Sequence, residues 1–461
     1  MNQAVLERDL HDFLARSQVS TEAAELDRHA GESGFGADVE PQRPDVVVFP
    51  EDVFQVAAIC SFASRTGVPI VPVGTRTGVG GMTRPAVGGI SLDMTRMDDL
   101  VAIHAQDFAA TVQPGLTRVA LNHRLAGEDL FFPVDPGADA SLGGMAATNA
   151  SGSRAMRYGA MRSNVLALQV VLADGSIVRT GTRARKSSAG YDLTRLLVGS
   201  EGTLGVITEL TLRLHAIPQS LLSARAAFPD ADAALRTVVA ITRRNLAVDR
   251  LEFLDGPTVG LVNDYKGTTY VESPTLLIEF AGPEDTVLAD TRAAQKLALE
   301  AGGTSFEFER EAAGQARLWE ARHHVGFAIL ARHPGKSLVG TDVCVPVSEL
   351  PGAIRHARRL LDERGLEASV IAHAGDGNYH VTFAIDRTNP VEVGQVRSIY
   401  VELIDHALAR GGTCSGEHGI GLAKIEFLER EHGDLIPAMR AIKQGLDPTG
   451  ILNPGKILRA V

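Results

Sequence analysis

The change in secondary-structure pattern near Pro218 is the feature that most constrains the fold of this chain. Before Pro218, an apolar strand at 46–49 leads into apolar residues at helical spacing and then into a strand at 70–73, which predicts a strand–helix–strand unit. After it, helical patterns alternate with short strands, as is typical of an antiparallel sheet covered by helices on one face. The sequence therefore predicts an α+β protein. Helices of the second half are predicted around 231–244, 284–301, 310–332, 351–364 and 391–410, and its strands near 251–254, 275–280, 341–345, 368–373 and 379–384.

The chain is too long for a single hydrophobic core. Its 461 residues exceed the size at which one core usually stops growing, so two or three domains are expected. We predict an N-terminal helical segment, two α+β domains and a glycine-rich C-terminal segment. Their predicted bounds are 1–40, 41–218, 219–410 and 411–461.

Charge and cysteine content argue against several classes of function. A formal net charge of −11 disfavours a nucleic-acid backbone or an anionic membrane surface as the main partner. Three scattered cysteines are too few for a disulfide framework or an iron–sulfur cluster. The N-terminus lacks the pattern of a targeting peptide, and no apolar run approaches the roughly 20 residues of a membrane span. The expected location is the cytoplasm, with peripheral attachment to a membrane-bound partner left open.

Two histidines flank a strong turn signal in the second half. Asp376-Gly377 favours a two-residue hairpin turn, which would place His373 directly opposite His380. Opposed side chains lie about 4.5–5.5 Å apart at Cβ, so both rings could bind one divalent ion. A turn centred one residue later, on Gly377-Asn378, would slip the register and separate the histidines. We expect the first register because it gives both histidines a common role.

A second polar pair, Glu417-His418, follows in a glycine-rich segment. Glu417 could supply an oxygen ligand to the same ion, and His418 could act as a base. Nitrogen and oxygen ligands together suit zinc or manganese, and the sequence does not choose between them.

Two loops, 72–81 and 136–152, hold far more than their share of the 47 glycines. Each follows a strand or an extended stretch, and glycine lets successive backbone N–H groups converge on an anion such as a diphosphate. Neither loop matches the glycine pattern of a Rossmann site or of a P-loop, and no other segment does. The sequence therefore predicts a diphosphate-containing ligand. It argues against a Rossmann dinucleotide site and a P-loop ATPase.

Taken together, these motifs resemble the FAD-binding oxidoreductases of the vanillyl-alcohol oxidase fold, from about residue 40 to the end of the chain. Within that family the chain is most similar to the branch that holds the cytochrome-type D-lactate dehydrogenases and the D-type subunits of glycolate oxidase. The resemblance implies a two-subdomain FAD-binding domain followed by an α+β cap domain with an antiparallel sheet, which would carry the substrate and metal sites. Besides the loops and the hairpin, it rests on 198–208, 416–421 and 453–456, while 186–191 and 341–346 are most like the D-lactate enzymes.

The resemblance also implies which residues contact FAD. Loop 72–81 would bind the pyrophosphate, 136–152 and 201–207 would line the rest of the cofactor, and Asn453 would lie near the flavin. Covalent flavin links in this fold use histidine or cysteine, and 72–81 contains neither, so FAD is expected to be non-covalent. The residues expected at FAD are Pro72, Gly74, Thr75, Arg76, Thr77, Gly78, Gly80, Pro136, Gly137, Ser141, Gly143, Gly144, Thr148, Asn149, Ser151, Gly152, Glu201, Gly202, Gly205, Ile207 and Asn453.

Oxidation of a 2-hydroxy acid needs an anchor for the carboxylate, a base for the hydroxyl proton and a hydride acceptor over Cα. A metal on His373, His380 and Glu417 could chelate the substrate and lower the pKa of its hydroxyl. His418 could then take the proton while hydride leaves Cα for flavin N5. This scheme requires the metal ligands to lie beside the flavin ring.

Two further residues bear on the substrate through the resemblance. Arg322 matches an arginine that binds the substrate carboxylate in related 2-hydroxy-acid dehydrogenases, a role that a guanidinium fork fits. Relatives that oxidise 2-hydroxyglutarate have a polar amide two residues after the second histidine, where this chain has Thr382. A small monocarboxylate, D-lactate first, is therefore the expected substrate, with a glycolate or 2-hydroxyglutarate enzyme as the alternative.

Other functions stay open at this point. The chain could be a metal-dependent hydrolase whose glycine loops bind a phosphorylated substrate, or a non-catalytic flavin-binding subunit of a larger complex. The expected electron acceptor is a cytochrome, a quinone or an electron-transfer flavoprotein, and a homodimer is a possible assembly.

Overall fold

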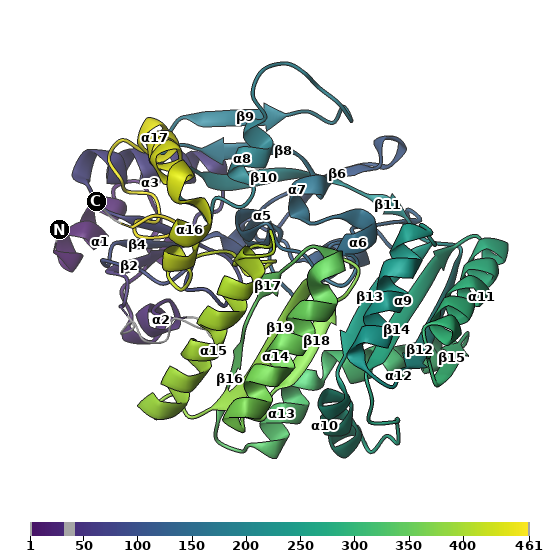
Figure 1. The fold of residues 1–461 in the computed structure, drawn as a ribbon. Coiled ribbons are helices and arrows are strands. Elements are labelled where there is room, and N and C mark those ends of the chain that lie inside the picture. Colours follow the sequence, from purple (N-terminus) through teal and green to yellow (C-terminus); the bar gives the residue numbers. More distant parts are fainter. Residues whose placement is uncertain (1, 32–41, 460–461) are drawn as a thin grey trace. The chain divides into compact units, whose positions relative to one another are not determined.

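The chain passes back and forth between two folding units in the structure, a computed structural model that describes residues 2–31 and 42–459 (Figure 1). Unit 1 consists of the residues up to Ser151, of Tyr158–Ile217 and of Glu417 to the end, whereas unit 2 consists of Gly152–Arg157 and Pro218–Gly416. The C-terminal segment thus belongs to the same unit as the N-terminal half.

Unit 1 is built on two main sheets. The strand–helix–strand unit predicted from 46–73 forms as β2 (Val46–Val48), α3 (Val53–Thr66) and β3 (Ile70–Val73). The later strand β4 (Ile90–Asp93) lies between β2 and β3 and pairs with both in parallel. Asp52 caps α3 through the N–H of Gln55, and Gly67 ends it in a left-handed conformation. The first sheet has the order β1 (Val19–Ser20), β2 (Val46–Val48), β4 (Ile90–Asp93), β3 (Ile70–Val73), and the second, antiparallel sheet has the order β5 (Leu100–His104), β6 (Ala109–Val112), β10 (Val206–Arg213), β8 (Val165–Val171), β9 (Ile177–Gly181).

The remaining elements of unit 1 surround these sheets. A buried apolar core lies between α3 and the first sheet, and a second lies between α5 (Leu142–Thr148) and the antiparallel sheet. The other elements are β7 (Leu130–Phe131), β11 (His215–Ala216), α1 (Gln3–Leu10), α2 (Ala23–Arg28), α3 (Val53–Thr66), α4 (Arg118–Arg124), α5 (Leu142–Thr148), α7 (Met161–Asn164), α8 (Leu193–Leu197), α16 (Ile425–His432) and α17 (Ile436–Leu446); α6 (Ala155–Tyr158) spans the change of unit.

Unit 2 is an eight-stranded antiparallel sheet with helices. Its strand order is β15 (Ser305–Glu309), β12 (Ser220–Ala227), β14 (Thr275–Gly282), β13 (Val248–Leu254), β18 (Ser369–His373), β19 (Asn378–Ile385), β16 (Ser337–Gly340), with β17 (Val343–Cys344) also paired to β19. Its helices are α9 (Ala231–Arg243), α10 (Gly256–Lys266), α11 (Glu284–Glu300), α12 (Ala312–His323), α13 (Val325–Arg332), α14 (Leu350–Arg364) and α15 (Pro390–Leu408).

The sheet of unit 2 is covered more fully than its sequence pattern indicated. Consecutive residues of β14 from Thr275 to Ala281 are buried, so side chains on both faces are shielded, and the expectation of one covered face was wrong. On one face, Trp319 of α12 and Val325 of α13 pack against Leu254 and Ile371. Helices α9, α11, α14 and α15 pack side by side, and α11, α14 and α15 contact strands of the sheet (Figure 1).

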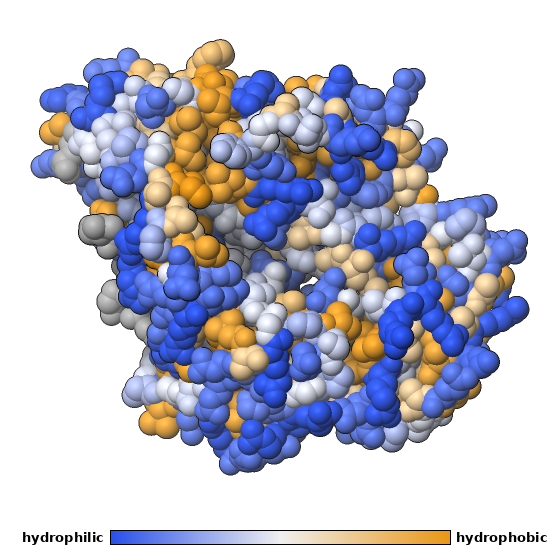
Figure 2. Space-filling model, turned by 45° about the horizontal axis from the view of Figure 1, so that its top comes forward, coloured by the Kyte–Doolittle hydropathy of each residue, from blue (hydrophilic) through white to orange (hydrophobic). Residues whose placement is uncertain are grey.

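Hydrophilic side chains cover much of the face shown in Figure 2, with smaller apolar areas between them. Among the helices that the structure describes, none is both long and apolar enough to cross a bilayer.

Candidate active site

The two predicted histidines come from adjacent strands, but in a different register from the predicted one. His373 pairs with Asn378, and His380 pairs with Ile371. The two-residue turn was therefore wrong: residues 374–377 form the loop, with the Asp376 N–H donating to the His373 carbonyl at 3.1 Å. The loop is bonded to residues far away in the sequence, because the Ala374 N–H donates to the Leu251 carbonyl at 2.8 Å and the Gly377 carbonyl accepts from the Val345 N–H at 3.0 Å. Since this register differs from the predicted one by two residues, both imidazoles still lie on one face of the sheet.

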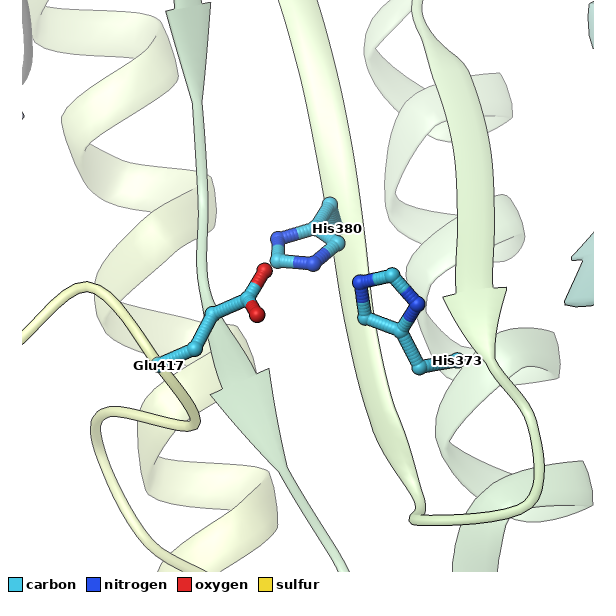
Figure 3. Close-up of side chains that lie close together, drawn as sticks. All are labelled: His373, His380 and Glu417. Carbon is cyan, nitrogen blue, oxygen red and sulfur yellow. The ribbon is translucent and has the colours of Figure 1, made fainter. Parts of the chain in front are cut away.

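Each imidazole is held through Nδ1. His380 Nδ1 lies 2.9 Å from the Thr341 carbonyl, and His373 Nδ1 lies 2.6 Å from Oε1 of Glu252. A hydrogen bond at Nδ1 places the proton there and leaves the Nε2 lone pair for a metal. The ring centroids are 5.5 Å apart and the rings are nearly perpendicular (Figure 3).

Glu417 completes a three-residue group. One ligand atom from each of His373, His380 and Glu417 can be chosen so that all lie within 4.8 Å of one another. Glu417 directly follows Gly416, whose N–H donates to Asp342 Oδ1 at 3.1 Å. A Cβ on Gly416 would lie 2.0 Å from the side-chain amide of Asn378, so only glycine fits there. Two imidazole nitrogens and a carboxylate suit zinc or manganese, and their spacing fits one divalent ion.

His418 stands next to this group with its side chain about a third exposed. Its Nε2 is 4.0 Å from Oε1 of Glu417. The following turn is fixed by the buried Glu201, whose two carboxylate oxygens accept from the N–H groups of Ile420 and Gly421 at 2.6 and 2.8 Å. Glu201, which we predicted at FAD, therefore also holds the segment that carries His418.

Glu252 is a functional candidate that the sequence reasoning missed. It is fully buried on β13, where it pairs directly with His373 of β18. Its Oε2 accepts from Nε of Arg322 at 2.7 Å. Burial alone raises the pKa of Glu252, but His373 and Arg322 outweigh it and lower that pKa to about 2, so the carboxylate is ionised. An acid flanked by apolar residues, in Leu251-Glu-Phe-Leu254, was the available signal.

The predicted FAD residues converge in part on one cavity of unit 1. Ten predicted residues line this cavity: Pro72, Gly74, Ser141, Gly143, Gly144, Thr148, Glu201, Gly202, Gly205 and Ile207. Residues not predicted also line it, namely Val73, Met82, Thr83, Met94, Pro114, Ala147 and Val206.

Glycines of both loops, Gly74, Gly143 and Gly144, line the cavity, and such backbone suits a phosphate-bearing cofactor. The two glycine loops touch, since the Ser141 N–H donates to Thr75 Oγ1 at 3.1 Å and a Cβ on Gly74 would meet Ser141 Oγ at 2.1 Å. Helix α5 begins directly after Ser141, and the N–H groups of Leu142 and Gly143 donate to the Leu116 and Pro114 carbonyls at 2.8 Å each, which fixes the second loop against its neighbours.

The other predicted FAD residues do not line the cavity. Arg76 pairs with Asp93 at 2.9 Å, and the side chain of Asn453 donates to the carbonyls of Met82 and Glu201. These residues hold neighbouring loops in place. The residues outside the lining are Thr75, Arg76, Thr77, Gly78, Gly80, Pro136, Gly137, Asn149, Ser151, Gly152 and Asn453.

Comparison with known proteins identifies the family. Residues 44–181 match the FAD binding domain, and residues 217–457 match the C-terminal domain of FAD linked oxidases. The chain belongs to the FAD-linked oxidase family. It is 44% identical to a probable mitochondrial D-lactate dehydrogenase of Danio rerio over 90% of this chain and 84% of that protein. It is 43% identical to the mitochondrial D-lactate dehydrogenase [cytochrome] of Arabidopsis thaliana, over 90% and 73%.

Further relatives agree with this assignment. Glycolate oxidase subunit GlcD of Bacillus subtilis is 35% identical over 94% of this FAD-linked oxidase and 93% of the relative. The 4-ethylphenol oxidase of Gulosibacter chungangensis matches the fold with a TM-score of 0.80 at 18% identity, over 99% of this chain and 97% of that one. The resemblance to the vanillyl-alcohol oxidase fold and its D-lactate branch is thereby confirmed, as is the α+β fold class.

Proposed function

We propose that this FAD-linked oxidase is a divalent-metal-dependent dehydrogenase that oxidises a small D-2-hydroxy acid, D-lactate first, to the 2-oxo acid. The observation that carries the proposal is the group of two imidazoles and a carboxylate in a chain whose relatives include D-lactate dehydrogenases. A hydroxy acid can bind one metal ion through its hydroxyl and carboxylate oxygens together. Protein ligands that hold a single ion are therefore what this substrate requires.

The residues at the cavity of unit 1 would hold FAD, and His373, His380 and Glu417 would hold zinc or manganese. When bound, FAD supplies a two-electron acceptor and the ion supplies a Lewis acid for the substrate oxygens. Loop 72–81 offers no histidine or cysteine, which supports non-covalent binding of FAD.

The remaining chemistry falls to His418 and Arg322. His418 would accept the hydroxyl proton at Nε2, since an imidazole has an ordinary pKa close to neutral pH. Arg322 donates its Nε–H to Glu252, and its terminal Nη groups are the donors that would bind the substrate carboxylate. Thr382 on β19, largely buried, replaces the amide expected for a dicarboxylate substrate.

The partners follow from the same relatives. The Arabidopsis relative is named for a cytochrome, which supports a cytochrome as the acceptor, while a quinone or an electron-transfer flavoprotein stays an alternative. Both D-lactate relatives are named as mitochondrial proteins, so they do not support the predicted cytoplasmic location. Both halves of the chain match FAD families, which argues against the metal-dependent hydrolase.

Anaerobic titration of the purified protein with a panel of hydroxy acids tests the proposal. D-lactate should bleach the flavin absorbance, L-lactate should not, and glycolate and D-2-hydroxyglutarate should act more slowly. Bleaching by glycolate alone would favour the glycolate-oxidase reading suggested by the GlcD relative. A flavin that no hydroxy acid reduces would indicate the non-catalytic flavin-binding role.

A further inference from the structure

Glu252 contacts both a proposed metal ligand, His373, and the proposed substrate-binding residue Arg322. One carboxylate oxygen, Oε1, is 2.6 Å from Nδ1 of His373, and the other, Oε2, accepts from Nε of Arg322 at 2.7 Å. Glu252 lies on β13, His373 on β18 and Arg322 on α12. Arg322 follows Glu252 by 70 positions in the sequence, and His373 follows it by 121. Each oxygen therefore serves one partner, and the carboxylate joins the metal ligand to the carboxylate-binding arginine.

A structural explanation alone accounts poorly for this residue. Glu252 has no exposed side-chain surface, and its neighbours Leu254, Leu277 and Ile371 belong to an apolar core. Burying a charge is costly, and apolar residues of similar volume often replace a buried ion pair without loss of stability. A carboxylate in this place is better explained by what its two partners must do.

The two contacts have definite chemical consequences. An acceptor at Nδ1 keeps the proton on that nitrogen, turns the ring and makes Nε2 a stronger ligand. A carboxylate at Nε of an arginine restricts the plane of the guanidinium and leaves Nη donors that can bind a second carboxylate.

We propose that Glu252 is a positioning residue that orients the metal ligand His373 and the substrate-binding Arg322 together. The proposal rests on the proposed function, because it takes the roles of His373 and Arg322 from there. It predicts that one substitution weakens both metal binding and substrate binding, although Glu252 touches neither ligand.

The decisive variant is Glu252→Gln, with Asp255→Asn as the matched control. Glutamine keeps the size of the side chain but has one acceptor oxygen, so it cannot accept from His373 and Arg322 at once. Asp255 is a buried acid directly after the same strand, paired with Arg358, and the asparagine variant keeps an acceptor for the N–H of Thr258.

Calorimetric titration of the FAD-loaded, metal-free proteins with Mn²⁺ or Zn²⁺ gives the first readout, without substrate. Glu252→Gln should bind the ion 10- to 100-fold more weakly than wild type, the usual effect of losing such an outer partner, and Asp255→Asn should bind normally. At saturating metal, Glu252→Gln should also raise KM for D-lactate at least tenfold. Equal metal affinity in wild type and Glu252→Gln would overturn this inference and leave the proposed function standing. A wild type that binds no ion would refute the metal site and, with it, the role of Glu252.

A spectroscopic measurement on the unmodified protein covers the case in which Glu252→Gln fails to fold. In ¹⁵N spectra, the imidazole signal that disappears in His373→Gln should show the proton on Nδ1. A signal with the proton on Nε2 would exclude the hydrogen bond to Glu252 that the inference requires.

Discussion

Replacing Asp342 with alanine should destabilise the protein by about 4 kcal/mol and weaken the metal site. The carboxylate is fully buried and accepts from Asn378 Nδ2 at 2.9 Å, Ser415 Oγ at 3.0 Å and Gly416 N at 3.1 Å. Hydrogen bonds to a charged group contribute about 1.5–3 kcal/mol each, so three correspond to roughly 4–9 kcal/mol. We expect the lower end, because Ser415 and Gly416 are only half-buried and can bind water instead.

The metal effect follows from the same contacts. Gly416 directly precedes Glu417, and Asn378 pairs with His373, so Asp342 ties the two parts of the ligand group together. Loss of this tie should lower metal affinity along with stability.

Asp342→Asn is the control for this prediction. It keeps Oδ1, which accepts from both Asn378 and Gly416, and the Ser415 hydroxyl can turn to accept from the new amide. This variant should lose only about 1–2 kcal/mol, roughly one charged hydrogen bond. Urea unfolding followed by circular dichroism and titration with Mn²⁺ measure the two effects. The reasoning fails if Asp342→Ala unfolds at the wild-type urea concentration, or if Asp342→Asn loses as much as Asp342→Ala.

Three further predictions concern histidines. His418→Ala should keep flavin and metal while kcat falls about 10²- to 10⁴-fold, the usual share of a general base, and near-normal turnover would remove His418 from the mechanism. His373→Ala should lose metal and activity together in elemental analysis and dye-reduction assays, and full metal content would contradict the ligand pair. Burial, with the neighbouring His356 and Arg410, lowers the pKa of His406 to about 4 in the folded state. In the unfolded state the pKa of a histidine is about 6.5, so the unfolded state binds a proton at His406 more readily than the folded state. Stability should therefore fall as the pH drops from about 6.5 to 4, and His406→Gln should flatten this trend in urea midpoints; an unchanged slope in the variant would count against it.

Regular periodicity made much of unit 2 predictable. The helices expected at 231–244, 284–301 and 351–364 agree with α9, α11 and α14 to within a residue at each end. The helix expected at 310–332 is two helices, because His324 has φ −90° and ψ 5° and interrupts the regular backbone. Helix α10 was missed although Asp255 and Pro257 mark its start. It has few apolar residues and begins directly after a strand, so its helical periodicity is weak.

The site was predictable where its chemistry is local. His373 and His380 lie seven positions apart around a turn, so their common face could be inferred from the sequence. Their register could not, because residues 374–377 make backbone hydrogen bonds with Leu251 and Val345, which are far from them in the sequence. Glu252 escaped prediction for the same reason, as its partners are brought to it only by the pairing of β13 with β18 and by the packing of α12.

The central claim, that an ion on His373, His380 and Glu417 is required for hydroxy-acid oxidation, is tested most directly by reducing the flavin with D-lactate under anaerobic conditions before and after metal removal. The flavin-loaded protein should bleach when it holds its metal, should stay oxidised after chelation, and should recover when Mn²⁺ or Zn²⁺ is restored. Full-rate bleaching of a protein shown by elemental analysis to be free of metal would contradict the account.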